Sequence, residues 1–225
     1  MLRRELEYFF GAIRFFTRLP VPGWVGHSAE ALNRSARYFP AVGLLVGGIG
    51  ALVFLGAMQL WPQPVAVLLS MAATIYATGA FHEDGLSDTV DGLGGGWDKL
   101  RILEIMKDSR VGSYGVVAMV LALLGKFTLL AALDDGLVPF ALLAGHALSR
   151  FCATVLLATM DYVREDLLSK AKPLATRLSG AEMAVALTFV LAALVLLPPE
   201  KAIVGCVLAA LATFWLAGKF KRWLG

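Results

Sequence analysis

The chain has 225 residues, of which 58% are hydrophobic and only 16% are charged, whereas about 25% of the residues in an average soluble domain are charged. Its formal net charge of +3 is too small for a protein that binds nucleic acid through a broad basic face. The composition therefore favours an integral membrane protein over a water-soluble globule, and it predicts no nucleic-acid partner.

The first twenty residues predict an amphipathic helix. Apolar side chains recur at helical spacing, and charged side chains take the other side. The apolar set is Leu2, Leu6, Phe9, Phe10, Ile13 and Phe16, and the charged set is Arg3, Arg4, Glu7, Arg14 and Arg18. We expect this helix to lie in the headgroup layer of a bilayer, the alternative being an ordinary soluble amphipathic helix. The charges within it argue against a removable export signal.

Six apolar runs follow, and each is a candidate for a membrane-spanning helix. They are Phe39–Leu60, Val65–Phe81, Val111–Leu133, Leu137–Met160, Met183–Leu197 and Ala202–Phe220. The link Trp61–Pro64 is so short that the first two runs are predicted to form a tight helical hairpin. The second run is predicted to continue into the polar segment after it without a break, since no breaker separates them.

Small residues indicate where these helices approach one another. Gly43, Gly47, Gly48 and Gly50 follow a small-xxx-small spacing, which allows two membrane helices to pack closely. The two cysteines, Cys152 and Cys206, both fall in apolar runs, and their separation suits neither a disulfide framework nor a metal site. We expect both to be packing residues.

Basic residues alternate between the two sides of the membrane. One side collects Arg3, Arg4, Arg14, Arg18, Arg34, Arg37, Lys99, Arg101, Lys107, Arg110, Arg164, Lys170, Lys172, Arg177, Lys219, Lys221 and Arg222. The opposite side holds only Lys201. Because basic loops stay in the cytoplasm, both termini are predicted to be cytoplasmic.

The segment 82–112, called the acidic segment below, holds seven acidic and four basic residues. Asp84, Asp88 and Asp91 are spaced i, i+4, i+7, so a helix places the three carboxylates on one face. Like charges repel at this spacing, and an all-oxygen set suits Mg²⁺ or Mn²⁺ rather than zinc. The sequence therefore predicts a divalent metal site, the alternative being a solvated acidic helix end.

A second helix is predicted after a glycine-rich turn at Gly92–Gly96, with Asp98 as its N-cap. Arg101, Glu104 and Asp108 are predicted to share one face of it. Two acidic helix faces joined by a turn can close around one or two divalent ions. Four neighbouring groups are candidates for binding phosphate, namely the side chains of Lys107, Ser109 and Arg110 and the backbone around Gly112.

Two cations fall inside predicted membrane helices, Lys126 in the third run and Arg150 in the fourth. An unpaired ion at that depth costs several kcal/mol, so such residues usually have a function. Their predicted partners are the acidic segment or an anionic substrate. Arg150 could instead tie two helices together, and His146 could be a hydrogen-bond donor between helices.

These motifs resemble the cobalamin synthase family, also called adenosylcobinamide-GDP ribazoletransferase, which are polytopic membrane enzymes. The matching pieces are Phe15–Pro22, Tyr38–Gly48, Phe81–Gly92 and Arg101–Gly115. The resemblance extends more loosely through Lys126 and Ser149–Arg150 to 162–166. The apolar runs and the resemblance together predict an all-α, membrane-embedded single domain over 1–225 with about six spans in the bacterial cytoplasmic membrane, and with the acidic segment in the cytoplasm.

The resemblance implies that adenosylcobinamide-GDP is joined to α-ribazole or its 5′-phosphate, with release of GMP and with Mg²⁺, or Mn²⁺ in its place. The implied metal ligands are Asp84, Asp88, Asp91, Glu104 and Asp108, and Asp108 is alternatively the general base. The implied contacts to phosphate or to the transition state are Lys107, Arg110, Lys126 and Arg150, and His82 is implied to touch substrate or support a carboxylate. Of these, Asp88, Asp108, Arg110 and Lys126 are expected to act in catalysis.

Two other functions compete with this interpretation. A CDP-alcohol phosphotransferase-like enzyme shares the spacing of Asp88 and Asp91-Gly92, but its Ala-Arg pair is replaced here by other residues. A transporter would line an ion path with Lys126, Arg150 and the acidic residues, although these acids cluster at one membrane face. The chain ends at Gly225, so we expect it to lack the family's C-terminal segment, and the sequence leaves a homo-oligomer open.

Overall fold

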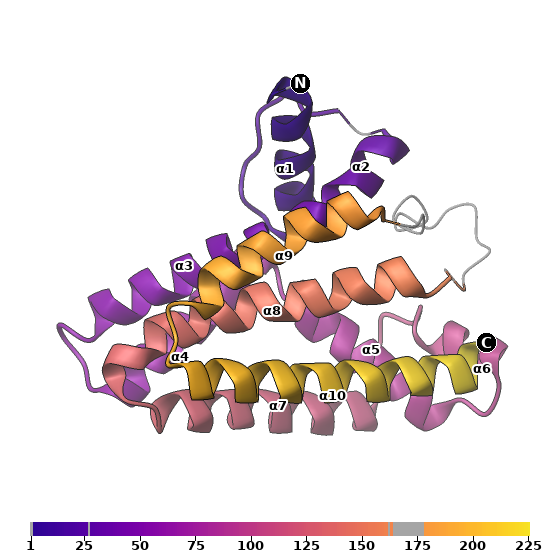
Figure 1. Cartoon of the computed structure of the whole chain (residues 1–225). Coiled ribbons are helices and arrows are strands. Elements are labelled where there is room, and N and C mark those ends of the chain that lie inside the picture. The colour runs from indigo at the N-terminus through magenta and orange to yellow at the C-terminus, as the bar shows by residue number, and fades with distance from the viewer. Residues whose placement is uncertain (1, 27, 162, 164–177) are drawn as a thin grey trace.

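The computed structural model describes residues 2–26, 28–161, 163 and 178–225. All regular structure in this part of the chain is helical, which confirms the predicted all-α fold (Figure 1). The helices are α1 (Leu2–Phe16), α2 (Ala29–Ser35), the 3-10 turn η1 (Ala36–Tyr38), α3 (Phe39–Ala57), α4 (Gln63–Thr78), α5 (Phe81–Gly95), α6 (Lys99–Ile105), α7 (Ser113–Ala131), η2 (Asp135–Leu137), α8 (Val138–Thr159), α9 (Gly180–Leu194) and α10 (Pro199–Leu224).

Four helices in the described ranges are long and apolar enough to cross a membrane. They are Glu30–Ala57, Ser113–Ala131, Asp135–Thr159 and Pro199–Leu224. The pair α4 and α5 passes this test only when taken together, as a broken span or a re-entrant loop, and α9 is shorter than a full span. The structure therefore supports a membrane protein with several spans, but the predicted number of six is not confirmed.

The chain breaks between α4 and α5, where the sequence predicted a continuous helix. Gly79 and Ala80 adopt the left-handed conformation, with φ of 64° and 58°, and the two helices meet at a bend of 84°. For alanine this conformation costs about 1–2 kcal/mol. The N-terminal segment stabilises the break, because the Arg18 backbone N–H donates to the Ala77 carbonyl at 2.8 Å. The side chain of Arg18 lies where a Cβ on Gly79 would be.

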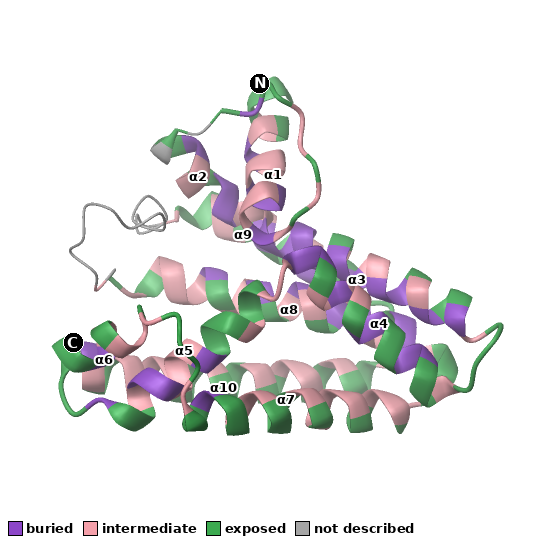
Figure 2. Ribbon diagram, turned by 180° about the vertical axis from the view of Figure 1, so that it is seen from behind, coloured by how far each residue is buried: buried purple, intermediate pink, exposed green. Residues whose placement is uncertain are grey.

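The core is built on the close approach of α3 to α8. A Cβ on Gly47 would lie 2.7 Å from the carbonyl oxygen of Leu142, and one on Gly43 would collide with the backbone of His146. The predicted role of glycine spacing is thus confirmed for these two positions, whereas Gly48 faces open space. Figure 2 shows the result, with buried residues along α3 and mostly exposed or half-buried residues on α10.

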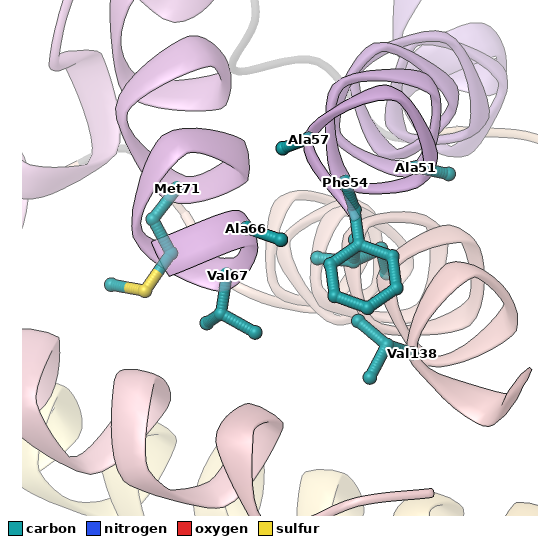
Figure 3. Close-up of a cluster of buried hydrophobic side chains, with 8 residues drawn as sticks. Ala51, Phe54, Ala57, Ala66, Val67, Met71 and Val138 are labelled. Atoms are coloured by element: carbon teal, nitrogen blue, oxygen red, sulfur yellow. The ribbon is translucent and has the colours of Figure 1, made fainter. Parts of the chain in front are cut away.

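A cluster of buried apolar side chains fixes the hairpin of α3 and α4 against α8 (Figure 3). Phe54 of α3 is fully buried with Val67 of α4 and Val138 of α8. Burying one such side chain contributes about 1.5–3 kcal/mol. The hairpin predicted from the short link is therefore present, and it packs against α8.

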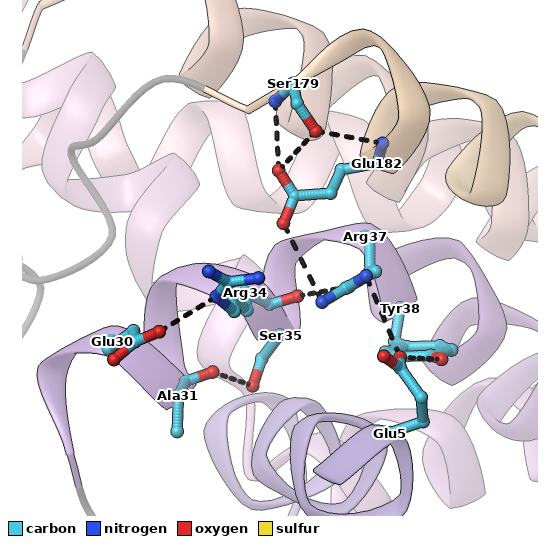
Figure 4. A network of polar contacts seen from close by, with 9 residues as sticks. All are labelled: Glu5, Glu30, Ala31, Arg34, Ser35, Arg37, Tyr38, Ser179 and Glu182. Atoms are coloured by element: carbon cyan, nitrogen blue, oxygen red, sulfur yellow. Dashed lines mark hydrogen bonds and ion pairs between the residues drawn. The ribbon is translucent and has the colours of Figure 1, made fainter. Parts of the chain in front are cut away.

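A network of polar contacts joins the N-terminal helix to α9 (Figure 4). Arg37 of η1 forms ion pairs with Glu5 of α1 at 3.7 Å and with Glu182 of α9 at 3.8 Å. The hydroxyl of Tyr38 donates to Glu5 at 2.7 Å. Part of the apolar side of α1 is buried against the protein, so its placement in the headgroup layer stays a prediction. The predicted basic residues Arg164, Lys170, Lys172 and Arg177 lie outside the described residues.

Candidate active site

Asp91 of α5 caps the start of α7. Its two carboxylate oxygens accept hydrogen bonds from the backbone N–H groups of Gly112 and Gly115, each at 2.8 Å, and the residue is only 8% exposed. The first N–H groups of a helix have no partner within it, and a negative charge is favourable there. A Cβ on either glycine would collide with Asp91. The Gly112 N–H that the sequence assigned to phosphate is therefore used by Asp91.

Two other residues lie on the same face of α5 as Asp91, in the turns that precede it, and this face packs along α7. Ser87 is buried, and a Cβ on Gly115 would collide with its hydroxyl. Glu83, one turn further on, is half-buried, and its Oε2 atom is buried without a hydrogen-bond partner among the described residues. Glu83, Ser87 and Asp91 thus form a stripe at i, i+4 and i+8 that faces α7.

The other carboxylates of α5 do not gather with Asp91. Asp84 is exposed and Asp88 is half-buried on the surface of the helix. In the described part of the chain, no three Asp, Glu, His or Cys side chains come together closely enough to hold a metal ion. The predicted common face is therefore not a metal site in this arrangement, because Asp91 is turned into the contact with α7.

The turn after α5 is shorter than predicted. Helix α5 continues to Gly95, and Gly96 is the first of these glycines outside it. Close packing explains the glycines, since a Cβ on Gly92 would lie 2.6 Å from the side chain of Met106 and one on Gly96 would collide with Ile102. The predicted N-cap is confirmed, because the Asp98 carboxylate accepts from the Arg101 N–H at 3.0 Å.

The acidic side chains beyond α5 pair with local arginines. Glu104 accepts from Arg101 at 2.7 Å. Helix α6 ends at Ile105, so Asp108 does not share its face, which corrects the prediction. Asp108 instead accepts from the backbone and the guanidinium of Arg110, with a shortest contact of 2.6 Å. These hydrogen bonds lower the pKa of Asp108 to about 2. Lys107 and Ser109 are exposed beside this pair.

A second set of charges, called the buried charge cluster below, comprises Glu83, Lys126, His146 and Arg150. Arg150 is 3% exposed, and its Nη1 donates to the carbonyl of His146 at 3.1 Å. Its Nε and Nη2 atoms, and the Nε2 atom of His146, are buried without a hydrogen-bond partner in the part of the chain that is described. Glu83 lies within electrostatic range of both Lys126 and Arg150.

Two features connect this cluster to the rest of the predicted site. Lys126, His146 and Ser149 line a cavity of about 340 Å³ between α7 and α8. The ring of Phe16 packs on both the Arg150 guanidinium, at 5.5 Å, and the His82 ring, at 5.4 Å. The predicted contacts His82, Lys126 and Arg150 therefore do come together, around the inner end of α5.

Glu83 was missed by the sequence analysis, which weighed only the carboxylates at i, i+4 and i+7 from Asp84. The available signal was the second stripe, since Glu83, Ser87 and Asp91 are also spaced by whole helical turns. A glutamate that directly follows an apolar run is also a candidate to offset the charge of a cation inside a predicted membrane helix, such as Lys126.

Comparison with known proteins identifies related chains. The family model of cobalamin-5-phosphate synthase matches residues 8–225. The adenosylcobinamide-GDP ribazoletransferase of Shewanella amazonensis is 53% identical over 184 residues, which are 80% of this chain and 71% of that protein. The protein of the same name from Vibrio cholerae is 46% identical over 226 residues, covering 100% of this chain and 85% of the relative. No solved structure matches.

Proposed function

The chain belongs to the cobalamin-5-phosphate synthase family, and from that premise we propose that it joins adenosylcobinamide-GDP to α-ribazole or to its 5′-phosphate. A hydroxyl oxygen of the ribazole forms a bond to the phosphorus attached to cobinamide. The bond from that phosphorus to the bridging oxygen breaks, GMP leaves with this oxygen, and the hydroxyl proton passes to a base. The product is adenosylcobalamin or its 5′-phosphate.

The observation that supports this site best is the state of Arg150. A buried guanidinium with two nitrogens that lack partners among the described residues is costly, and a partner of opposite charge removes much of that cost. Phosphate oxygens suit its planar fork, and Lys126 adds a second cation beside a cavity. We therefore assign Arg150 and Lys126 to the negative charge of the diphosphate and of the transition state, with His82 as a further substrate contact.

The residues of the acidic segment that lie outside the buried charge cluster have a different role in this proposal. Asp108 is fully ionised at neutral pH, but a group with a pKa of about 2 accepts a proton poorly. We therefore propose Asp88 rather than Asp108 as the general base. Arg110, Lys107 and Ser109, which are exposed, bind phosphate at the membrane surface.

We propose Mg²⁺ as the cofactor, with Mn²⁺ as the alternative, from the chemistry of the oxygen donors alone. Bound at the acidic segment, such an ion would neutralise diphosphate charge. The carboxylates as placed do not form a site for it, since Glu104, Asp108 and Asp91 are each held by other partners. No step of the proposed transfer is therefore assigned to a metal.

We propose that the enzyme is a multi-pass protein of the bacterial inner membrane with both termini in the cytoplasm. The alternation of basic residues supports this orientation. The C-terminus lies beside α6 (Figure 1), and Gly225 is close to the side chain of Lys99. The acidic segment and the C-terminus are thus at the same end of the bundle, as the orientation requires.

The test is turnover by purified protein in lipid vesicles with adenosylcobinamide-GDP, α-ribazole and Mg²⁺. We expect a cobalamin and GMP to form in equal amounts, and we expect Arg150→Met to abolish their formation. Lys201→Met, at the start of α10, is the control and should keep full activity. Ion flux through the vesicles without turnover would instead favour a transporter, and transfer only from a CDP-alcohol would favour the related phosphotransferases.

A further inference from the structure

Glu83 carries the negative charge of the buried charge cluster. It interacts electrostatically with both Lys126 and Arg150, and Arg150 has no other acidic group that interacts with it comparably among the described residues. The remaining titratable groups that face this place are His82 and His146. Two cations against one carboxylate leave one positive charge in apolar surroundings, which is costly unless an anion binds there.

The fold brings Glu83 to this position through two fixed contacts. The outer end of the stripe on α5 is held at the start of α7, because Asp91 accepts from Gly112 and Gly115. Helices α5 and α7 run antiparallel from that point, so the inner end of the stripe lies deeper along α7, towards Lys126. On the other side, α3 and α8 approach closely at Gly43, which places the turn of α8 that carries His146 and Arg150.

The unpartnered atoms indicate that the cluster is arranged for a ligand. Glu83 Oε2, Arg150 Nε and Nη2, and His146 Nε2 are all buried and lack hydrogen-bond partners within the described ranges. A purely structural ion pair would use these atoms on each other, since each unmade bond to a charged group costs more than about 1–3 kcal/mol. The donors of Arg150 outnumber the acceptors, so the missing ligand is an acceptor, such as a phosphate.

We propose that Glu83 is a positioning residue for phosphate transfer, which holds Lys126 and Arg150 together as cations so that both meet the incoming diphosphate. This inference rests on the proposed function. Glu83 touches no reacting atom in it. Its negative charge attracts both cations towards one place before the substrate enters, and preorganised charges stabilise a transition state more than mobile ones.

The proposal predicts a distinctive kinetic change for Glu83→Gln. Removal of the negative charge leaves the site more positive, so the KM for adenosylcobinamide-GDP should stay the same or fall. The cations lose their fixed geometry, and misplacement by about 1 Å can cost about 100-fold. We therefore expect kcat to fall about 10- to 100-fold, and we expect Glu83→Asp to recover part of this loss.

The matched control is Glu182→Gln, which also removes a carboxylate paired with an arginine, Arg37, but away from the cluster. Its kcat and KM should stay within twofold of the wild type. A double mutant cycle completes the test, because Glu83→Gln should have a smaller effect once Lys126→Met has removed one of the two cations. Thermal unfolding of each variant in detergent shows how much of the protein is folded, so that each rate can be expressed per folded enzyme.

The proposal is overturned if the kcat of Glu83→Gln stays within twofold of the wild type, or if its loss simply multiplies with that of Lys126→Met. Should the wild type show no turnover, the proposed function fails, and unfolding then tests the pairing alone. Glu83→Gln should lower the unfolding temperature and added Lys126→Met should restore part of it. If no restoration occurs, the role of Glu83 is rejected as well.

Discussion

The carboxylates at the surface and the one in the buried charge cluster are placed in opposite ways. Glu104 is exposed and Asp108 is half-buried at the surface, and each is paired with an arginine two or three residues away. Glu83, half-buried between helices, has an oxygen without a hydrogen-bond partner in the described structure and faces cations on α7 and α8. The surface pairs form between neighbouring residues and need no buried charge. The cluster brings together charges from three helices, and burying them lowers stability.

This difference indicates which of the two groups of charges lowers the stability of the fold and is therefore expected to serve function. Exposed ion pairs contribute little and are screened by salt. Buried groups that lack partners lower stability, and proteins retain them mainly where a ligand or a reaction needs them. The surface acids are conspicuous in the sequence because they are numerous, but the cluster carries the stronger structural argument for a site.

Removal of divalent metal is expected to have the largest effect, and it tests whether the carboxylates at the surface have a function of their own. We expect excess EDTA to abolish cobalamin formation and Mg²⁺ or Mn²⁺ to restore it, because such an ion would neutralise the charge of the diphosphate substrate. The measurement is cobalamin formed per minute before and after metal is added back, with Ca²⁺ as a control for charge alone. Full turnover in EDTA would leave the surface acids without a role in metal binding.

Widening the contact between α3 and α8 should have the next largest effect. A valine at Gly43 collides with the backbone of His146, whereas one at Gly48 meets open space. We expect Gly43→Val to destabilise the protein by about 3 kcal/mol and to lower turnover by displacing Arg150. Gly48→Val is the matched control. Equal unfolding temperatures for the two variants in detergent would contradict the close approach of the helices.

Asp91 and Asp84 offer a direct test of buried against exposed carboxylates. Asp91→Ala leaves two N–H groups at the start of α7 without partners, so we expect a loss of about 2 kcal/mol in unfolding free energy. Asp84→Ala should change it little. Both measurements are made in EDTA, so that metal binding does not contribute. Equal destabilisation by the two changes would show that the capping role of Asp91 is wrong.

The pair of Asp108 and Arg110 should give the smallest effect. The pKa of Asp108 is lowered from 3.8 to about 2 by hydrogen bonds from Arg110, so the pair makes its full contribution to stability only above pH about 4. That contribution disappears as the pH falls from about 4 to about 2. We expect the unfolding temperature of Asp108→Asn to be slightly lower than that of the wild type at neutral pH. At pH about 2 the two unfolding temperatures should be equal. If the difference between the two unfolding temperatures grew as the pH fell, the stabilising role of the Asp108–Arg110 pair would be contradicted.

Local signals in the sequence predicted local structure well. The N-cap Asp98, the hairpin of α3 and α4, and the packing role of Gly43 and Gly47 all follow from residues within a few positions of each other. The membrane class followed from composition, since uninterrupted apolar runs of this length are typical of helices that cross a bilayer.

The errors at Gly79 and Asp91 involve partners that are distant in the sequence. The break at Gly79 and Ala80 depends on Arg18, which contacts it from the N-terminal segment. The burial of Asp91 depends on N–H groups more than twenty residues later. Helical spacing alone could not choose between the stripe that starts at Glu83 and the one that starts at Asp84, because both are regular.

The hydrogen bonds between Asp91 and the start of α7 also have a geometric consequence. They join the last turns of α5 to the start of α7. Lys126 lies eleven residues beyond Gly115 on α7, which is about 16 Å at 1.5 Å per residue. The hydrogen bonds of Asp91 therefore set the distance along α7 between the end of the acidic segment and the half-buried Lys126.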